Sequence, residues 1–365
     1  MEDELLYQIA LTLVPNIGDV HAKELISRFE CASNIFKAKR KDLESIEGIG
    51  TIRIKSILDF KDFKRAEEEV KFIKKFKISA LFISDPRYPQ RLLNCFDPPT
   101  LLFFKGNADL NASKIIAVVG TRKNNEYGKL LCEKTISELA SENVLIVSGL
   151  AFGIDTIAHK TALKNNLNTI GVVAHGLDRL YPPENKNLAI EMIEQGGILS
   201  EFKSDTNPDK QNFPKRNRIV AGMCDAVLVI ESGLKGGSLI TAELGNSYNK
   251  DVFAFPGRVG DSRSEGCNYL IKNNKAAMVT SAKDILENLG WISQKKEVKR
   301  QRELFIDFTN EERIIIDILK NTEEMHIDQL YQKSKLSSSA IASALLTLEM
   351  QGVVATLPGK MYKQV

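Results

Sequence analysis

The fold of this chain is decided by residues 114–128, which read KIIAVVGTRKNNEYG. Five consecutive apolar residues end in Gly-Thr-Arg, and a helix-like segment, 127–140, follows. A continuous apolar run bounded by a turn is typical of a strand buried on both faces, as in a parallel sheet. Gly120, Thr121 and Arg122 then lie at the carboxyl end of this strand, where open α/β sheets bind their ligands. Because a helix N-terminus offers free N–H groups and Arg offers a planar fork, we expect an anion there.

Three later stretches repeat this pattern of an apolar run followed by glycine. They are 144–153 (VLIVSGLAFG), 226–237 (AVLVIESGLKGG) and 251–257 (DVFAFPG). One such loop is explained by a glycine that merely turns a strand into a helix. Together the loops deliver Gly, Ser or Thr to one rim of the sheet, which favours a phosphate-lined cleft.

Composition places the chain among ordinary globular proteins. Its 365 residues, 43% hydrophobic and 27% charged, are enough for two or three domains with a sizeable core. The net charge of +3 is too small to indicate nucleic-acid binding by itself, so any basic surface must be local. The five cysteines are odd in number and show no C-x-x-C spacing, which disfavours disulfides and zinc and fits a reducing cytosol.

The N-terminus and the hydropathy predict a soluble, cytoplasmic protein. The first residues, MEDELLYQ, are acidic and lack the apolar core of a signal peptide. No apolar run approaches the length needed to span a membrane.

Residues 1–65 are predicted to form a helical domain. Apolar residues recur at helical spacing around a turn at 15–18, and the pattern repeats around Gly48-Ile49-Gly50. The second unit resembles a helix-hairpin-helix (SAM-like) domain, in which hairpin N–H groups can contact a nucleic-acid phosphate. A small helical bundle whose glycines only make turns fits equally well. Lysines and arginines between 37 and 65 make the region basic.

Residues 66–292 are predicted to form a Rossmann-like α/β core. A charged helix leads into short strands near 80–83 and 101–104, which are separated by a proline-rich stretch. From 114 onward strands alternate with helices, which predicts βαβ units and a doubly wound, mostly parallel sheet. No G-x-G-x-x-G follows the first strand and no G-x-x-x-x-G-K-[ST] occurs, so we expect neither NAD nor an NTPase site, and no cofactor.

The C-terminal part is predicted to consist of a charged linker, 293–308, and a winged helix, 309–365. The linker contains KKEVKRQR, whose low hydrophobicity and high charge are typical of flexible segments. Three helices and two strands follow, and Thr309 can cap the first helix together with Glu312. The third helix, SSSAIASALLTLEMQ, has no Lys or Arg, so we expect an interaction or packing role rather than sequence-specific DNA reading.

The cationic stretch 213–218, FPKRNR, opens a predicted helix. Single-strand binders combine cations for the backbone with aromatic faces for the bases, and Phe213 beside three cations fits this combination. Two structural alternatives stay open: Phe213 packs in the core beside solvated cations, or Arg216 or Arg218 forms an internal ion pair. At 236–238, Gly-Gly-Ser begins a helix and could bind an anion or serve only as a cap.

Asp155 and His159 are four residues apart on a predicted helix and can face one another. A catalytic acid–base pair and a satisfied internal hydrogen bond both fit, and the structural interpretation is favoured. His175 ends a strand near the same rim, but no second His or Cys lies at ligand spacing, so we expect no metal site.

Seven motifs occur in an order that resembles the DNA-processing protein A family, also called DprA or Smf. They are GTRKNNEYG, SGLAFGIDTIAH, HGLDRLYPPENKNL, SEF, FPKRNRIVAG, GGSLITAE and FAFPG. The resemblance spans the chain and implies a helix-hairpin-helix-like domain, a Rossmann-like core and a winged-helix tail. It further implies a homodimer that binds single-stranded DNA without hydrolysing it, protects incoming DNA during natural transformation and loads the bacterial strand-exchange recombinase RecA.

The resemblance also implies a DNA pocket without catalytic or metal-ligating residues. The residues that match the family's pocket are Gly120, Thr121, Arg122, Ser148, Gly149, Phe213, Lys215, Arg216, Asn217, Ser238 and Thr241. Two positions depart from the family pattern. Gly236-Gly237-Ser238 stands in place of the usual Ser-Gly-Ser, which removes one hydroxyl from a phosphate loop, and His175 stands where a small residue is common.

The stretch GGSLITAE is also similar to the Gly-Gly-x-Gly-Thr-x-x-Glu loop of Rossmann-like nucleoside-monophosphate phosphoribohydrolases. In such an enzyme Glu243 would be catalytic and Arg122 would hold a 5′-phosphate. The predicted flanking domains weigh against this interpretation, because a small-molecule hydrolase needs neither of them. A purely scaffolding protein would leave the Gly/Ser/Arg rim unexplained.

Overall fold

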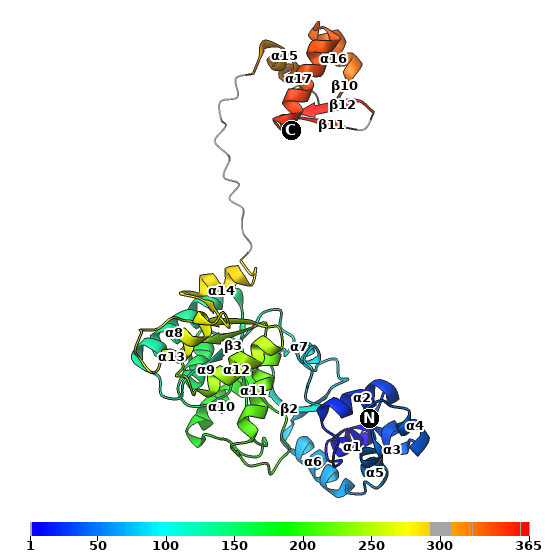
Figure 1. Ribbon diagram of the computed structural model, residues 1–365, viewed down its shortest axis with the longest axis vertical. Coiled ribbons are helices and arrows are strands. Elements are labelled where there is room, and N and C mark those ends of the chain that lie inside the picture. The colour runs from blue at the N-terminus through cyan, green and yellow to red at the C-terminus, as the bar shows by residue number, and fades with distance from the viewer. Residues whose placement is uncertain (1, 293–307, 321, 323, 358, 365) are drawn as a thin grey trace. The chain divides into compact units, whose positions relative to one another are not determined.

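The computed structural model describes residues 2–292, 308–320, 322, 324–357 and 359–364 (Figure 1). The chain divides into two compact units, Met1–Ile292 and Ser293–Val365. The predicted linker, 293–308, lies outside the described residues except for Phe308. None of the described helices is both long and apolar enough to cross a membrane.

The first unit begins with a group of short helices, drawn in blue in Figure 1. Gly48, between α4 and α5, has a φ of +82°, a left-handed conformation that favours glycine and explains the predicted hairpin. Buried apolar residues such as Leu25 and Leu43 join the same apolar cluster as one face of the central sheet. The bounds are α1 Glu2–Leu11, α2 Asp19–Phe29, α3 Ala32–Lys37, α4 Arg40–Glu44, α5 Thr51–Leu58 and α6 Phe63–Phe76.

Nine strands of the described first unit form one sheet in the order β1-β2-β6-β5-β4-β3-β7-β8-β9. From β6 to β9 in this order, every pair of adjacent strands is parallel. The two pairs at the other edge, β1–β2 and β2–β6, are antiparallel. The predicted mostly parallel, doubly wound sheet is therefore confirmed. The bounds are β1 Ser79–Phe82, β2 Leu101–Gly106, β3 Ile115–Val119, β4 Leu145–Ser148, β5 Thr169–Val172, β6 Gly196–Ser200, β7 Ala226–Val229, β8 Asp251–Ala254 and β9 Ala277–Met278.

Strand β3 is buried along its whole length, as its apolar run predicts. Because successive side chains of a strand point to opposite faces, Ile115 and Ala117 join one apolar cluster, and Ile116 and Val118 join another. Helices from both sides complete these clusters, which gives the core three layers. Packed with Ile116 are α8 Glu126–Leu139, α9 Ile154–Lys164 and α14 Ala282–Asn288, and packed with Ile115 are α11 Asn212–Gly222, α12 Gly237–Ser247 and α13 Glu265–Lys272.

Shorter elements complete the first unit. Helix α10 covers β5 and β6 through a smaller apolar cluster that contains Leu188 and Met192. The proline-rich stretch before β2 holds only one short helix, which follows a proline as expected for a residue that cannot sit in a helix interior. The bounds are α7 Gln90–Leu93, α10 Lys186–Glu194 and two 3₁₀ turns, Ala140–Glu142 and Pro183–Asn185.

The second unit is a winged helix, as the sequence predicts. Thr309 and Glu312 cap the first helix reciprocally: Glu312 Oε2 accepts from the Thr309 amide at 2.8 Å, and Thr309 Oγ1 accepts from the Glu312 amide at 3.3 Å. Strand β12 pairs with both β10 and β11 in an antiparallel sheet. The bounds are α15 Asn310–Leu319, β10 Met325–His326, α16 Ile327–Ser334, α17 Ser338–Met350, β11 Val354–Leu357 and β12 Met361–Gln364.

Candidate functional site

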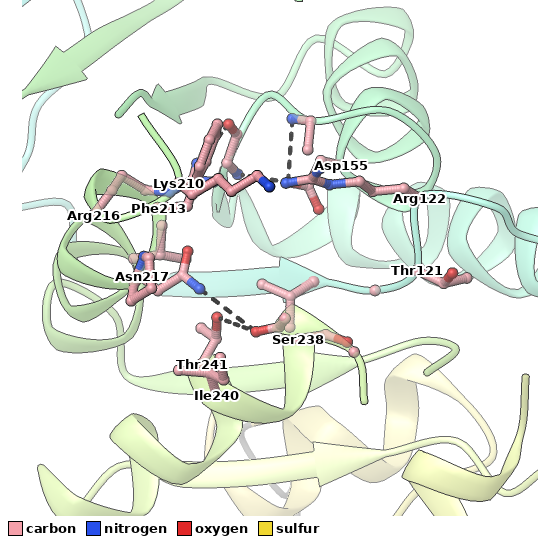
Figure 2. Close-up of a pocket in the computed structure, with 18 of the residues that line it drawn as sticks. Thr121, Arg122, Asp155, Lys210, Phe213, Arg216, Asn217, Ser238, Ile240 and Thr241 are labelled. Carbon is pink, nitrogen blue, oxygen red and sulfur yellow. Dashed lines mark hydrogen bonds between the residues drawn. The ribbon is translucent and has the colours of Figure 1, made fainter. Parts of the chain in front are cut away.

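A cleft of about 660 Å³ opens at the carboxyl edge of the sheet (Figure 2). Its walls come from the loops after β3 and β4 and from the first turns of α11 and α12. Strand β3 lies between β4 and β7, so the chain builds the sheet outward in both directions from this point. Open α/β sheets bind their ligands at such a switch point.

Two glycines let the loops after β3 and β4 approach one another closely. A Cβ on Gly120 would lie 2.5 Å from Cγ1 of Ile154. A Cβ on Gly153, whose φ is +77°, would lie 2.3 Å from the Thr121 carbonyl oxygen. Thr121 is fixed in turn, because its amide donates to the Glu231 carbonyl at 2.8 Å and its carbonyl accepts from the Ile154 amide at 3.2 Å. The loop that carries Arg122 is therefore held rigidly against the sheet.

Arg122 and Phe213 face one another across the cleft. The guanidinium carbon of the exposed Arg122 lies 5.4 Å from the ring centroid of the half-buried Phe213. The Tyr181 ring lies 6.1 Å from the same ring. In Figure 2, Phe213 and Lys210 lie on the wall opposite Arg122. Phe213 is thus a cleft residue rather than a core residue, and it combines an aromatic face with neighbouring cations.

Arg216 places a buried cation in the cleft. It is 5% exposed, and its Nη1 donates to the carbonyl oxygens of Gly149 and Val172. Its Nε has no hydrogen-bond partner among the described residues. Burial lowers the pKa of Arg216 to about 10, against the opposing effect of Asp155, so the group stays cationic at neutral pH. A Cβ on Gly149 would lie 2.1 Å from Arg216 Nη1, so glycine leaves room for the guanidinium.

Polar groups from α11 and from the first turn of α12 surround an open helix N-terminus. Asn217 Nδ2 donates to the Gly237 carbonyl at 3.5 Å, and Thr241 Oγ1 donates to the same oxygen at 3.4 Å. Ser238 Oγ instead donates to another hydroxyl at 2.8 Å. The N-cap is Gly236, without a side-chain cap, so Ser238 is not the cap. Uncapped N–H groups at a helix start are a common anion site.

The structure places two of the predicted pocket residues outside this cleft. Ser148, the last residue of β4, is fully buried and its Oγ donates to the Val118 carbonyl at 2.6 Å. Lys215 is exposed and lines a different depression. Residues three and four apart share one face of a helix, so Phe213, Arg216 and Asn217 point into the cleft while Lys215 points away. All other predicted pocket residues line the cleft.

Arg218 forms the internal ion pair that the sequence left open. Its Nη2 pairs with Asp19 Oδ2 at 2.9 Å and also with Glu201. Arg216, the other candidate for such a pair, bonds to carbonyl oxygens instead. The cations of the FPKRNR stretch therefore have three different environments: exposed surface, buried cleft and internal ion pair.

Lys210 and Tyr181 also line the cleft but were not among the residues that the sequence singled out, whereas Asp155, considered there only as a partner of His159, is a third lining residue. Lys210 precedes α11 and lies in the irregular segment between β6 and that helix, so the helical pattern that includes Phe213 does not extend to it. Tyr181 comes from the loop after β5 and lies within the motif HGLDRLYPPENKNL, but none of the pocket residues that the resemblance implies comes from that motif. Asp155 accepts hydrogen bonds from the Gly149 and Ala151 amides at 3.2 and 3.3 Å, and burial raises its pKa against the opposing effect of Arg216.

The histidines near the rim have structural contacts. His159 does not bond Asp155: its Nδ1 lies 2.7 Å from Thr169 Oγ1, and burial lowers its pKa to about 3, so it is neutral. His175 Nε2 accepts from the Tyr181 amide at 3.1 Å, and its Nδ1 lies 2.9 Å from the Gly176 carbonyl. Within the described residues, no group of three or more His, Cys, Asp or Glu side chains could hold a metal ion.

Comparison with known proteins supplies the context for this cleft. Residues 79–290 match the model for DNA recombination-mediator protein A, and 306–360 match the DprA winged helix domain. Protein Smf of Synechocystis sp. is 33% identical over 99% of this chain and 99% of its own. Among solved structures, DNA processing protein A from Streptococcus pneumoniae matches with a TM-score of 0.66 and 35% identity, over 77% of this chain and 97% of that one.

A second solved structure carries information on a ligand. DNA processing protein A from Helicobacter pylori matches with a TM-score of 0.54 and 32% identity, over 59% of this chain and 97% of that one. That structure is described as giving insight into the unique single-stranded DNA binding mode of the Helicobacter protein.

Proposed function

Because this chain belongs to the DNA recombination-mediator protein A family, we propose that it binds single-stranded DNA in the cleft at the carboxyl edge of its sheet. The observation that carries the proposal is the pairing of Arg122 with Phe213 across the cleft. Single-strand sites combine cations that follow the phosphates with aromatic rings on which bases stack. The single-stranded DNA binding described for the Helicobacter relative supports this assignment.

The part of the DNA that each cleft residue is proposed to contact follows from how exposed its side chain is. The exposed Arg122 and Lys210 reach phosphate oxygens, and Arg can do so through two parallel hydrogen bonds. The buried Arg216 and the open N-terminus of α12 add fixed positive potential inside the cleft. Phe213 offers its face to one base. None of these groups reads a base edge, so sequence preference is expected to be weak.

Preference for single strands follows from the same contacts. Stacking on Phe213 needs a base that is free of its pair, and opening a duplex takes energy that the cleft has no motor to supply. We therefore propose a DNA-binding role without catalysis.

Further parts of the proposal rest on membership of the family. We propose that the protein protects incoming DNA during natural transformation, loads the strand-exchange recombinase RecA, and acts as a cytoplasmic homodimer. We also propose that 1–65 is a helical domain, 66–292 the DNA-binding core, 293–308 a linker and 309–365 a separate domain. The winged-helix match supports the last of these.

Titration of a labelled mixed-sequence oligonucleotide and its duplex at several salt concentrations tests the central proposal. We expect tighter binding of the single strand and an affinity that falls steeply with salt, because phosphate contacts release counterions. Tighter duplex binding, or an affinity insensitive to salt, would refute a phosphate-binding cleft.

The hydrolase alternative has less support from the geometry. Glu243, its catalytic residue, is exposed, pairs with Lys275 at 2.6 Å and does not line the cleft that holds Arg122. Incubation with nucleoside monophosphates and an assay for free base distinguishes the two proposals. Release of free base that depends on Glu243 would favour the enzyme.

A further inference from the structure

One wall of the cleft continues into a segment without helix or strand. This segment, residues 201–211, connects β6 to α11 and brings Pro208 and Lys210 to the cleft just before Phe213. A segment of this kind keeps its position only through the contacts that its backbone and side chains make. Those contacts therefore decide where Lys210 and Phe213 stand.

Helix α6 holds the segment through a buried carboxylate. Glu69 is 1% exposed, and its Oε1 and Oε2 accept from the Ser204 amide at 3.0 and 3.2 Å. Its Oε2 also accepts from the Ser204 hydroxyl at 2.5 Å. Arg65, one turn earlier, pairs with Glu69 at 2.9 Å and donates to the Ser204 carbonyl at 2.7 Å. The amide, hydroxyl and carbonyl of Ser204 are thus all bonded to α6.

A second contact from the N-terminal helices holds α11 itself. Arg218, on the side of α11 away from the cleft, pairs with Asp19, the first residue of α2. Asp19 also accepts from the amide of Thr100, the residue before β2, at 2.8 Å. This hydrogen bond fixes the Asp19 carboxylate beside the start of β2. The wall that carries Lys210 and Phe213 is therefore bonded to the N-terminal helices before and after those residues.

The core binds the opposite side of the segment. The Gly176 amide donates to the Thr206 carbonyl at 3.1 Å, and the Asp205 amide donates to Asp178 Oδ1 at 3.0 Å. The segment consequently lies between the loop after β5 and α6, and loss of the α6 contacts would remove the hydrogen bonds that hold Ser204 on the α6 side.

A charge at position 69 needs an explanation beyond the stability of α6. Ala66 and Ile73, three residues before and four after, are buried and apolar, so Glu69 lies on the apolar stripe of the helix. Burying a carboxylate is expensive unless it is paired and hydrogen-bonded, and an apolar residue would fill the position at lower cost. A buried carboxylate differs from an apolar residue by fixing its partners in direction as well as distance.

We propose that Glu69 is a positioning residue for the DNA cleft: by binding Ser204 it holds the segment so that Lys210 and Phe213 stand opposite Arg122. The proposal rests on the proposed DNA-binding function. It gives the N-terminal helices a part in DNA binding that requires no contact between these helices and DNA, unlike a phosphate-binding hairpin.

The test uses the full-length chain with Glu69→Ala, Glu69→Gln and Ser204→Ala. Glu68→Ala and Glu68→Gln are the matched controls, because Glu68 is an exposed neighbour on the same helix. We measure the Kd for a labelled oligothymidylate, amide hydrogen exchange without DNA, and the urea midpoint. Since hydrogen bonds to a charged group are lost, Glu69→Ala is expected to weaken binding about tenfold. Exchange in 201–213 should accelerate while that in β3 to β5 stays unchanged.

The affinity and the exchange rate together decide whether Glu69 positions the cleft wall. Glu69→Gln keeps an acceptor for the Ser204 amide, so partial rescue of both readouts is expected. Faster exchange with wild-type affinity would overturn the positioning role, and unchanged exchange would overturn the contact as a restraint. If Glu69→Ala does not fold, Glu69→Gln and Ser204→Ala supply the same two readouts. If the wild-type chain does not bind oligothymidylate, the proposed function fails, while the exchange result still judges the restraint.

Discussion

Replacement of Arg122 by alanine distinguishes a defined cleft from a diffuse basic surface. Arg122 is exposed at the tip of the loop after β3, and its guanidinium contacts the Phe213 ring. The loop itself is fixed by the Thr121 backbone and by Gly120 and Gly153, none of which the substitution alters. We therefore expect the unfolding free energy to change by less than about 0.5 kcal/mol, as for other surface positions.

The expected loss of affinity follows from the contact that Arg122 can make. A hydrogen-bonded contact between arginine and phosphate contributes about 1.5–3 kcal/mol. That range corresponds to a roughly 10- to 150-fold rise in Kd. One phosphate contact fewer should also lower the slope of log affinity against log salt by about 0.7.

Fluorescence anisotropy with a labelled oligonucleotide at several salt concentrations measures both quantities. Lys215→Ala is the matched control, because it removes one exposed cation close in sequence to Phe213 that points away from the cleft. We expect that variant to lose less than about threefold in affinity, as for screened surface charges. Equal losses at Arg122 and Lys215 would show that the cleft has no special part in binding.

Four further outcomes are expected. Phe213→Ala should weaken oligonucleotide binding by about 1–3 kcal/mol in the same titration, whereas Phe213→Tyr, which keeps a ring, should retain most of it. A chain that ends at residue 302 should keep its affinity, since the third helix of the winged helix has no Lys or Arg; gel shift checks this. Burial lowers the pKa of His159 to about 3 from 6.5, so the stability that the neutral His159 contributes is fully present above about pH 6.5 and is lost as the pH falls toward 3. Urea midpoints should fall across this range, and His159→Gln should show a smaller fall than the wild-type chain. Gly149→Ala would bring a Cβ to 2.1 Å from Arg216, and we expect a loss of about 1–3 kcal/mol in urea unfolding.

The sequence alone determined the architecture. Apolar runs of strand length, each ended by glycine and followed by a helical pattern, predict a parallel α/β sheet, and the structure contains it. The Thr309–Glu312 capping pattern likewise predicts the helix that begins there. These features are visible in sequence because strand burial, turn chemistry and helix capping act between neighbouring residues.

Most of the cleft residues were also identified from the sequence. The carboxyl ends of parallel strands meet at one edge, which predicts loop residues such as Arg122, and the family resemblance implies the residues on α11 and α12. Which way each side chain points was harder to predict. Ser148 is buried and bonded to the backbone of β3, and Lys215 turned away with the periodicity of α11. The direction of Lys215 could have been derived from helical periodicity, given correct element boundaries. Periodicity does not single out Ser148, because every residue of β4 is buried.

Only the tertiary structure decided the remaining contacts. Arg216 and Arg218 are two residues apart, yet one is buried in the cleft and the other is paired with Asp19, 199 residues away. Glu69 reaches Ser204 across 135 residues. No local pattern distinguishes these charges from solvated ones, because a buried charge is stable only where distant segments supply its partners, and folding alone brings those segments together.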